Sequence, residues 1–133
     1  AYKAGDLTFT PIPVNHTVPT VGYKVTDNGG SVMFSGDTGP MEKFWQVANK
    51  TNDLQAVIVD LSFSVREQFI ADISKHMTAE DVAEELKKLK NDCEVYAFHY
   101  KVGQASTVGA QAQRIMHFGK PVKNLREHAE LVF

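Results

Sequence analysis

The sequence predicts an α/β domain in which helices pack on a β-sheet, because strand-like and helix-like segments alternate along one short chain. The Asp-Asn-Gly-Gly cluster at 27–30 separates two strand-like runs and predicts a hairpin turn. The β-branched run at 56–59 is typical of a strand buried on both faces. With 133 residues, 43% apolar and 10% aromatic, the chain is expected to form a single domain with a hydrophobic core.

The first third of the chain is expected to form a meander of strands. Residues 7–10 alternate apolar and polar side chains and then meet two prolines, which predicts an edge strand because proline cannot donate to a central ladder. Residues 20–26 continue as a second strand. The residues of the following turn tolerate positive φ, so residues 31–35 should pair back as a third strand.

A helix and a buried strand are expected next. Residues 40–50 can form a helix, with Pro40 near its first position and apolar residues on one face. The strand at 56–59 follows and stops at Asp60. This order of strand, helix and strand continues the α/β pattern.

The clearest helix begins after Thr78, which can cap it, and acidic residues occupy its first turn. Apolar residues at the i, i+4 and i+7 spacing carry the helix to about residue 90. Residues 94–98 are expected to form another strand. Residues 101–113 are small and polar, which indicates a mobile loop or a weak helix, and residues 131–133 are expected to form a terminal strand.

The composition bears on partners and location. Fourteen Lys and Arg against sixteen Asp and Glu give a formal net charge of −2 and a pI near 6.2, which argues against nucleic acid or an anionic membrane as a general partner. No apolar run approaches the roughly 20 residues of a membrane span, and the first residues do not resemble a signal peptide. Cys93 is the only cysteine, which fits a reducing compartment, so a cytoplasmic location is expected.

Four polar residues directly follow strand-like runs, namely His16, Asp37, Asp60 and His99. In open α/β sheets the side chains at strand ends converge on one edge, where functional sites are built. Imidazole nitrogen and carboxylate oxygen together suit zinc, manganese or iron. These residues are therefore candidates for one metal-binding pocket.

Several candidate residues also have an ordinary structural interpretation. Asp37 before Thr-Gly-Pro is typical of an Asx-turn or a helix cap, and His16 of a loop histidine. His76 lies two residues before the capping threonine and can simply face solvent. His117 and His128 lie in polar surroundings near the C-terminus, and we assign neither a functional role.

The order of four motifs along the chain favours a functional interpretation of these residues over a structural one. The motifs PVNHTVPTVGYKV, FSGDTGP, SKHMTAEDVAEEL and YAFHYK, within residues 5–101, resemble the C-terminal half of the metallo-β-lactamase superfamily. Within it they look most like class II cyclic-nucleotide phosphodiesterases, with the tRNA 3′-end processing enzymes next. The resemblance implies the C-terminal half of an αββα sandwich, a mixed sheet with flanking helices.

The superfamily signature His-x-His-x-Asp-His is absent from the chain. In the family this motif belongs to the N-terminal half, so residues 1–133 are expected to be a single domain equivalent to the C-terminal half alone. We favour a fragment of a longer enzyme over a natural half-domain, because the later motifs are all retained in order. The missing half, or a partner chain that supplies it, would be needed to complete the site.

The resemblance implies that three residues of this chain bind metal ions. His16 matches the third-motif histidine, which ligates the first metal. Asp37 matches the aspartate that bridges two metals, and His99 matches the last histidine, which ligates the second. Two carboxylate oxygens can hold a pair of ions around a shared hydroxide that attacks phosphorus. The resemblance therefore implies two divalent ions, with zinc first and manganese or iron as alternatives.

The resemblance also implies three catalytic residues. His76 in HMT resembles the histidine that donates to the scissile phosphate or the leaving oxygen. Asp60 lies where the RNA-processing relatives keep a glutamate that orients this histidine, and it is one methylene shorter, which leaves its reach to His76 open. Lys101 falls where phosphodiesterase-like members often carry a lysine that neutralises phosphate, and it can equally be a surface lysine.

These features lead to three functional hypotheses. The first is a metal-dependent hydrolase of a small phosphodiester such as a cyclic nucleotide. The second is an RNA 3′-end processing nuclease of the same fold, against which stands the lack of a basic arm. The third is a non-catalytic interaction half-domain, whose exposed sheet face predicts a homo-oligomer or domain swapping.

Overall fold

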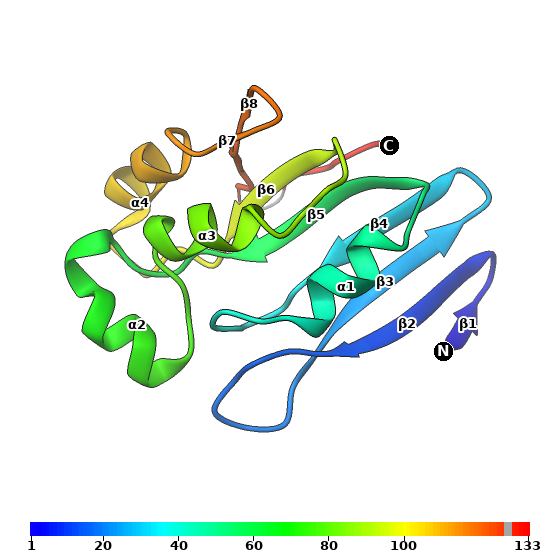
Figure 1. Cartoon of the computed structure of the whole chain (residues 1–133), viewed down its shortest axis with the longest axis horizontal. Helices are drawn as coiled ribbons and strands as arrows, with labels where there is room; N and C mark the ends of the chain where they lie inside the picture. The colour runs from blue at the N-terminus through cyan, green and yellow to red at the C-terminus, as the bar shows by residue number, and fades with distance from the viewer. Residues whose placement is uncertain (127–128) are drawn as a thin grey trace.

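The computed structural model describes residues 1–126 and 129–133, and it contains a seven-stranded mixed sheet with the order β1-β2-β3-β4-β5-β6-β9 (Figure 1). A separate pair, β7 and β8, forms a small hairpin. The strands are β1 (Tyr2–Ala4), β2 (Leu7–Pro13), β3 (Val21–Asp27), β4 (Gly30–Phe34), β5 (Leu54–Asp60), β6 (Glu94–Phe98), β7 (Met116–His117), β8 (Lys120–Pro121) and β9 (Lys123–Asn124). The helices are α1 (Lys43–Asn49), the 3₁₀ turn η1 (Val65–Glu67), α2 (Gln68–Ser74), α3 (Ala79–Leu86) and α4 (Ala105–Ala112).

The antiparallel part of the sheet confirms the predicted meander. Strands β2, β3 and β4 pair antiparallel, and the turn between β3 and β4 places Gly30 at φ +143°. The Asp27 carboxylate accepts the backbone N–H of Gly29 at 2.7 Å, which stabilises this turn. Strand β1 pairs only with residues 7–9 of β2, so the two prolines of β2 lie where that strand forms the edge of the sheet.

The parallel part of the sheet positions the site. Strands β4, β5, β6 and β9 run parallel to one another, so their C-terminal ends meet at the same edge. Strand β5 is the buried central member, and Val57 and Val59 have no exposed surface. Its hydrophobic run confirms the prediction of a strand covered on both faces.

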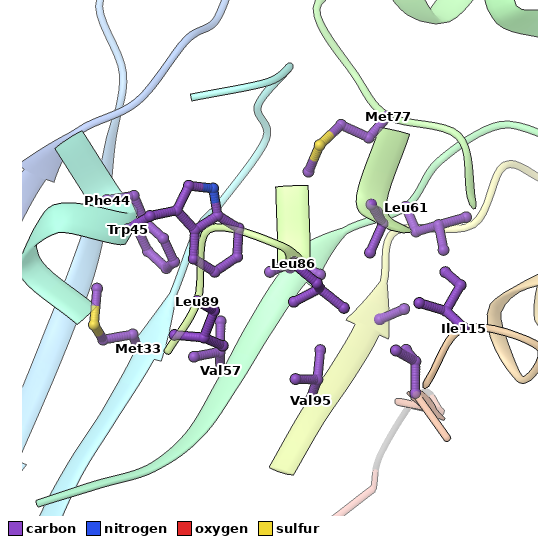
Figure 2. Close-up of a cluster of buried hydrophobic side chains, with 14 of the residues drawn as sticks. Met33, Phe44, Trp45, Val57, Leu61, Met77, Leu86, Leu89, Val95 and Ile115 are labelled. Atoms are coloured by element: carbon purple, nitrogen blue, oxygen red, sulfur yellow. The ribbon is translucent and has the colours of Figure 1, made fainter. Parts of the chain in front are cut away.

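The hydrophobic core lies between the sheet and the helices α1 and α3, which lie in front of the sheet in Figure 1. Trp45 and Phe44 meet edge to face at the sheet side of α1, with centroids 5.2 Å apart. Figure 2 shows how the apolar side chains of the strands meet those of the helices. The labelled members of this core are Met33, Phe44, Trp45, Val57, Leu61, Met77, Leu86, Leu89, Val95 and Ile115.

Along each strand, the side chains that alternate with the core residues point to the opposite face of the sheet, and several of them form an aromatic surface. Phe34 on β4 and Phe98 on β6 lie with their ring centroids 4.8 Å apart, and Phe34 is 36% exposed. Farther along the sheet, Phe9 stacks on Tyr2 at 4.9 Å. These partly exposed aromatic rings leave part of this sheet face open to solvent.

The predicted capping of α3 is confirmed. Thr78 accepts the N–H of Asp81, and the Asp81 carboxylate accepts the N–H of Thr78 in return, which forms a capping box. The helix ends at Leu86, earlier than the predicted residue 90, because the chain continues as turns with i→i+3 bonds up to Leu89. Leu89 still reaches the core, which explains the apolar spacing in the sequence.

Two other predicted elements need correction. Helix α1 begins at Lys43 and not near Pro40, because the preceding residues form a loop whose Pro40 carbonyl accepts from the Asn15 side chain at 2.9 Å. The terminal strand predicted at 131–133 is wrong, because the position beside β6 is taken by β9. The ring of Phe133 lies against the sheet, with its centroid 6.3 Å from that of Tyr96.

Several elements were not predicted from the sequence. Helix α2 exposes its apolar residues Phe69 and Ile73 at 75% and 62%, so it lacks the amphipathic pattern that identifies a helix. Strands β1, β7, β8 and β9 have only two or three residues each, too few for a period to appear. Within 101–113, where a mobile loop or a weak helix was expected, the structure has the helix α4. None of the described helices is long and apolar enough to cross a membrane.

Candidate metal centre

The candidate site lies at the C-terminal edge of the parallel strands. Asp60 is the last residue of β5, His99 follows β6, and Asp37 lies in the loop after β4. The segment between α2 and α3 adds His76. One ligand atom from each of these four residues lies within 4.8 Å of the others, which makes them a group able to hold a metal ion.

Asp60 is an anchor within this group. Its side chain has no exposed surface, and its Oδ2 accepts the backbone N–H of Thr38 at 3.0 Å and the Nδ1–H of His76 at 2.6 Å. Its Oδ1 accepts the hydroxyl of Ser62 at 2.5 Å. Because both oxygens already accept hydrogen bonds, the carboxylate is better suited to orient its neighbours than to bind a metal.

The short side chain of Asp60 reaches His76 because the backbone brings the two segments together. The N–H groups of Ser62 and Phe63, just beyond β5, both donate to the carbonyl of Met77, at 2.9 and 3.3 Å. This pairing draws the segment before α3 against the end of β5. His76 is consequently 8% exposed, so the interpretation of this histidine as a solvent-facing residue is wrong.

His16 lies beside the group of four without belonging to it. Its Nδ1 contacts the carbonyl oxygen of Lys75 at 3.1 Å, and its ring centroid is 5.1 Å from that of His76. When Nδ1 donates to a carbonyl, Nε2 is left unprotonated and able to bind a metal. This orientation is the one that metal-binding histidines usually have.

Asp37 is the accessible carboxylate of the site. The loop that carries it is held by the N–H of Thr38 on Asp60 and by the N–H of Asn15 on the Thr38 hydroxyl, at 3.1 Å. Its side chain is 42% exposed and lies 3.5 Å from Nδ1 of His99. The N-cap position of helix α1 is Glu42, and among the described residues no hydrogen bond involves the Asp37 carboxylate, so Asp37 is neither a helix cap nor an Asx-turn.

His99 occupies an unusual backbone conformation at the end of β6. Its φ is +76°, in the left-handed region that non-glycine residues rarely adopt. Such strain persists only where the surroundings enforce it, and here the preceding carbonyl of Phe98 accepts the N–H of Leu61 at 3.0 Å. The Nδ1 of His99 lies 2.9 Å from the Ser62 hydroxyl.

Lys101 lies near the histidines without entering the group. Its N–H donates to the carbonyl of Ser62 at 3.1 Å, and its ammonium lies 5.2 Å from the ring centroid of Phe63. The Phe63 ring is in turn 6.0 Å from that of His76. The cation is therefore held against an aromatic face beside the site.

A cavity of about 820 Å³ adjoins His99, within the size range of small-molecule pockets. Helix α4 forms one wall, and the strand-end residues and the segment after β9 form the others. Burial raises the pKa of Tyr100 to about 12, so its hydroxyl stays protonated and donates to Asn124. The lining includes Phe98, Tyr100, Ser106, Gln113, Asn124 and Arg126.

Among the described residues, His117 does not belong to this site. His117 is 6% exposed and its Nε2 lies 2.7 Å from the carbonyl of Asn91, which agrees with an ordinary structural role. His128 lies outside the described residues. Ser62, which contacts Asp60 and two histidines, was not identified from the sequence, because a serine after a buried strand has no distinguishing pattern.

The donor set is chemically suited to zinc, manganese or iron. His16, Asp37 and His99 offer imidazole nitrogen and carboxylate oxygen, while Asp60 is already engaged. A two-metal centre needs about three or four ligands for each ion. The described residues therefore fit part of such a centre, and further ligands would have to come from outside them.

A mixed sheet with helices on its face and histidine and aspartate side chains gathered at the parallel strand ends defines the metallo-β-lactamase class of folds. The Beta-lactamase superfamily domain matches residues 1–100, and the chain belongs to this family. No curated protein matches the sequence.

Solved structures agree with this assignment. The metallo-β-lactamase fold protein YhfI from Bacillus subtilis is 17% identical with a TM-score of 0.74, and the match covers 94% of this chain and 49% of that protein. A diphosphatase from the PhnP family is 17% identical with a TM-score of 0.71, covering 99% and 46%. Human tRNase Z, short form, is 14% identical with a TM-score of 0.64, covering 77% and 39%.

These similarities establish the fold of the chain and show how much of each solved structure the chain matches. The mixed sheet with flanking helices predicted from the motifs is confirmed. The chain spans about half or less of the length of the three solved structures named above.

Proposed function

We propose that this chain is the C-terminal half of a metal-dependent hydrolase that cleaves small phosphodiesters. The observation that carries the proposal is the pairing of three accessible ligands, His16, Asp37 and His99, with a buried Asp60–His76 pair beside them. A site for phosphate ester hydrolysis needs both parts, since the nucleophile and the leaving group require separate stabilisation.

The residues of this chain divide these tasks. His16, Asp37 and His99 would hold divalent ions, with zinc as the first choice, and these ions would supply an activated water as nucleophile. Asp60 keeps the Nδ1–H of His76 engaged at 2.6 Å, so that Nε2 faces away from this anchor and can exchange a proton with a leaving oxygen. Lys101 places a positive charge near the histidines, where a phosphate would bind.

A two-metal site also needs ligands beyond those that the described residues offer. The solved structures of YhfI and of the PhnP-family diphosphatase are about twice as long as this chain, so we propose that a second half completes the centre, either in the same polypeptide or as a partner chain. The half-exposed aromatic surface around Phe34 and Phe98 is suited to this packing. We also propose a cytoplasmic location, because Cys93, the one cysteine of this sequence, is buried and free.

The experiment is hydrolysis by the protein that includes both halves. We expect zinc- or manganese-dependent cleavage of bis(p-nitrophenyl) phosphate and of a cyclic nucleotide, lost in Asp37→Asn and in His76→Ala. Lys24→Ala, on strand β3, is a matched control that should leave activity unchanged. A protein that binds no divalent metal and leaves both substrates intact would refute the proposal.

RNA 3′-end processing is the second candidate. The Asp60–His76 pair favours it, as does the structural likeness to human tRNase Z. The formal net charge of −2 opposes it, because RNA binding depends on positive charge. Cleavage of a precursor tRNA without cleavage of cyclic nucleotides would reverse the ranking of the two candidates.

A non-catalytic interaction domain is the third candidate, and the aromatic sheet surface favours it. Under this hypothesis two copies of the chain would pack through that surface. A stable dimer that binds no metal in size-exclusion chromatography would support it, whereas a monomer would count against it.

A further inference from the structure

The hydroxyl of Ser62 is the point where the metal-binding side of the site meets the buried acid–histidine pair. Ser62 has no exposed surface, and its Oγ lies 2.5 Å from Oδ1 of Asp60 and 2.9 Å from Nδ1 of His99. A third, longer contact of 3.2 Å joins it to Nδ1 of His76. One oxygen atom therefore contacts three functional side chains.

The protons in this cluster can be placed by counting donors and acceptors. An ionised carboxylate only accepts, so the single proton of Ser62 goes to Asp60. Ser62 Oγ can then only accept from its other neighbours. The hydrogen bond at 2.9 Å consequently requires that Nδ1 of His99 carries a proton.

The same count of donors and acceptors places the ring proton of His76. Its Nδ1 lies 2.6 Å from Oδ2 of Asp60, so that nitrogen is the donor in the shorter bond. Asp60 therefore accepts from His76 and from Ser62, and Ser62 accepts from His99. The donor in each of these three hydrogen bonds therefore follows from the buried Asp60 carboxylate, which can only accept.

We propose that Ser62 is a positioning residue that holds His99 in the Nδ1–H tautomer, which leaves Nε2 unprotonated for a metal ion. This inference rests on the proposed function, in which His99 is a ligand. The metal ligand is thereby connected through Ser62 to the pair that serves the leaving group. The strained φ of +76° at His99 sets the backbone, and the hydrogen bond to Ser62 sets the ring.

The test measures the tautomer directly. In metal-free protein labelled with ¹⁵N-histidine, long-range ¹H–¹⁵N spectra at pH 8.5 distinguish the two neutral tautomers, because an ordinary imidazole is then uncharged. We expect the Nδ1–H form for His99 in the wild type and a shift toward the Nε2–H form in Ser62→Ala. Ser62→Thr keeps the hydroxyl and should restore the wild-type signal.

His117 is the internal control. Its Nε2 faces the carbonyl of Asn91 at 2.7 Å, so it should remain in the Nε2–H form in every variant, and an unchanged signal shows that the variant is folded. If the added methyl group of Ser62→Thr disturbs the buried site, the wild-type spectrum alone still decides. An Nε2–H form of His99 in the wild type would overturn the proposal.

A further outcome separates Ser62 from its neighbour. The Asp37 carboxylate lies 3.5 Å from the same nitrogen, so an Nδ1–H tautomer that persists in Ser62→Ala would show that Ser62 does not hold it. Zinc affinity is a second readout, expected to fall by about 10–100-fold in Ser62→Ala and to recover in Ser62→Thr. Inactivity toward phosphodiesters would refute the proposed function and leave the tautomer result standing.

Discussion

Replacing Asp60 by alanine should lower the free energy of unfolding by about 3–5 kcal/mol, because three donors lose their acceptor. These donors are the N–H of Thr38, the Nδ1–H of His76 and the hydroxyl of Ser62, at 3.0, 2.6 and 2.5 Å. Each buried donor without a partner costs about 1–3 kcal/mol. The total stays below the simple sum because the hydroxyl can rotate to another acceptor.

Asp60→Asn is the more specific test, because it reverses one hydrogen bond and keeps the others. Its amide oxygen can keep the bonds to Thr38 and His76, so the loss should be only about 1–2 kcal/mol. The amide nitrogen then faces Ser62 and donates to it. Ser62 must donate to His99, whose proton moves to Nε2, the atom needed for the metal. Zinc affinity should consequently fall by about 10–100-fold in a protein that remains folded.

Both effects are measurable in the same preparation. Urea unfolding can be followed by the fluorescence of Trp45, the single and buried tryptophan, and zinc binding by titration against a competing chelator. A loss below about 1 kcal/mol in Asp60→Ala would refute the hydrogen-bond count. Wild-type zinc affinity in Asp60→Asn would refute the assigned direction of the protons.

Four further predictions concern the core, a cap, a close contact and the metal. Phe44→Ala should cost about 3–5 kcal/mol in urea unfolding because Phe44 is fully buried, whereas Phe69→Ala, at a 75% exposed residue, should change stability by less than about 0.5 kcal/mol. Thr78→Ala removes a capping box and should cost about 1–2 kcal/mol by the same assay, and an unchanged midpoint would contradict this. Gly22→Ala places a Cβ 2.6 Å from a carbonyl oxygen of β4, and calorimetry should show a loss of about 1–3 kcal/mol. Zinc at about 100 times its Kd should stabilise the protein containing both halves by about 2.7 kcal/mol, and His16→Ala should reduce this shift in a thermal melt.

Local patterns in the sequence were sufficient where local physics decides the structure. The Asp-Asn-Gly-Gly turn, the apolar run of β5 and the cap at Thr78 were all predicted, because turn geometry, burial and capping depend on residues close together in the chain. Helix α2 was missed because its apolar side chains face solvent. The prediction of a terminal strand at 131–133 was wrong because β9 occupies the position beside β6.

The candidate site was predicted in part. The strand-end rule pointed to Asp37, Asp60 and His99, and the parallel strands bring them to one edge. The contribution of His76 came from a resemblance of motifs, since the sequence alone allowed a solvent-facing histidine. The structure buries it against Asp60.

The sequence by itself determined the α/β class and the family, because these follow from residue types, order and spacing. It also supplied His16, Asp37 and His99 as candidate metal ligands, which remain a prediction. Only the tertiary structure decided how these side chains contact one another. Three donors, from Thr38, Ser62 and His76, converge on the buried Asp60 carboxylate, and the Ser62 hydroxyl lies within hydrogen-bond distance of both His76 and His99. Such convergence depends on contacts between residues up to 37 positions apart, which no local pattern records.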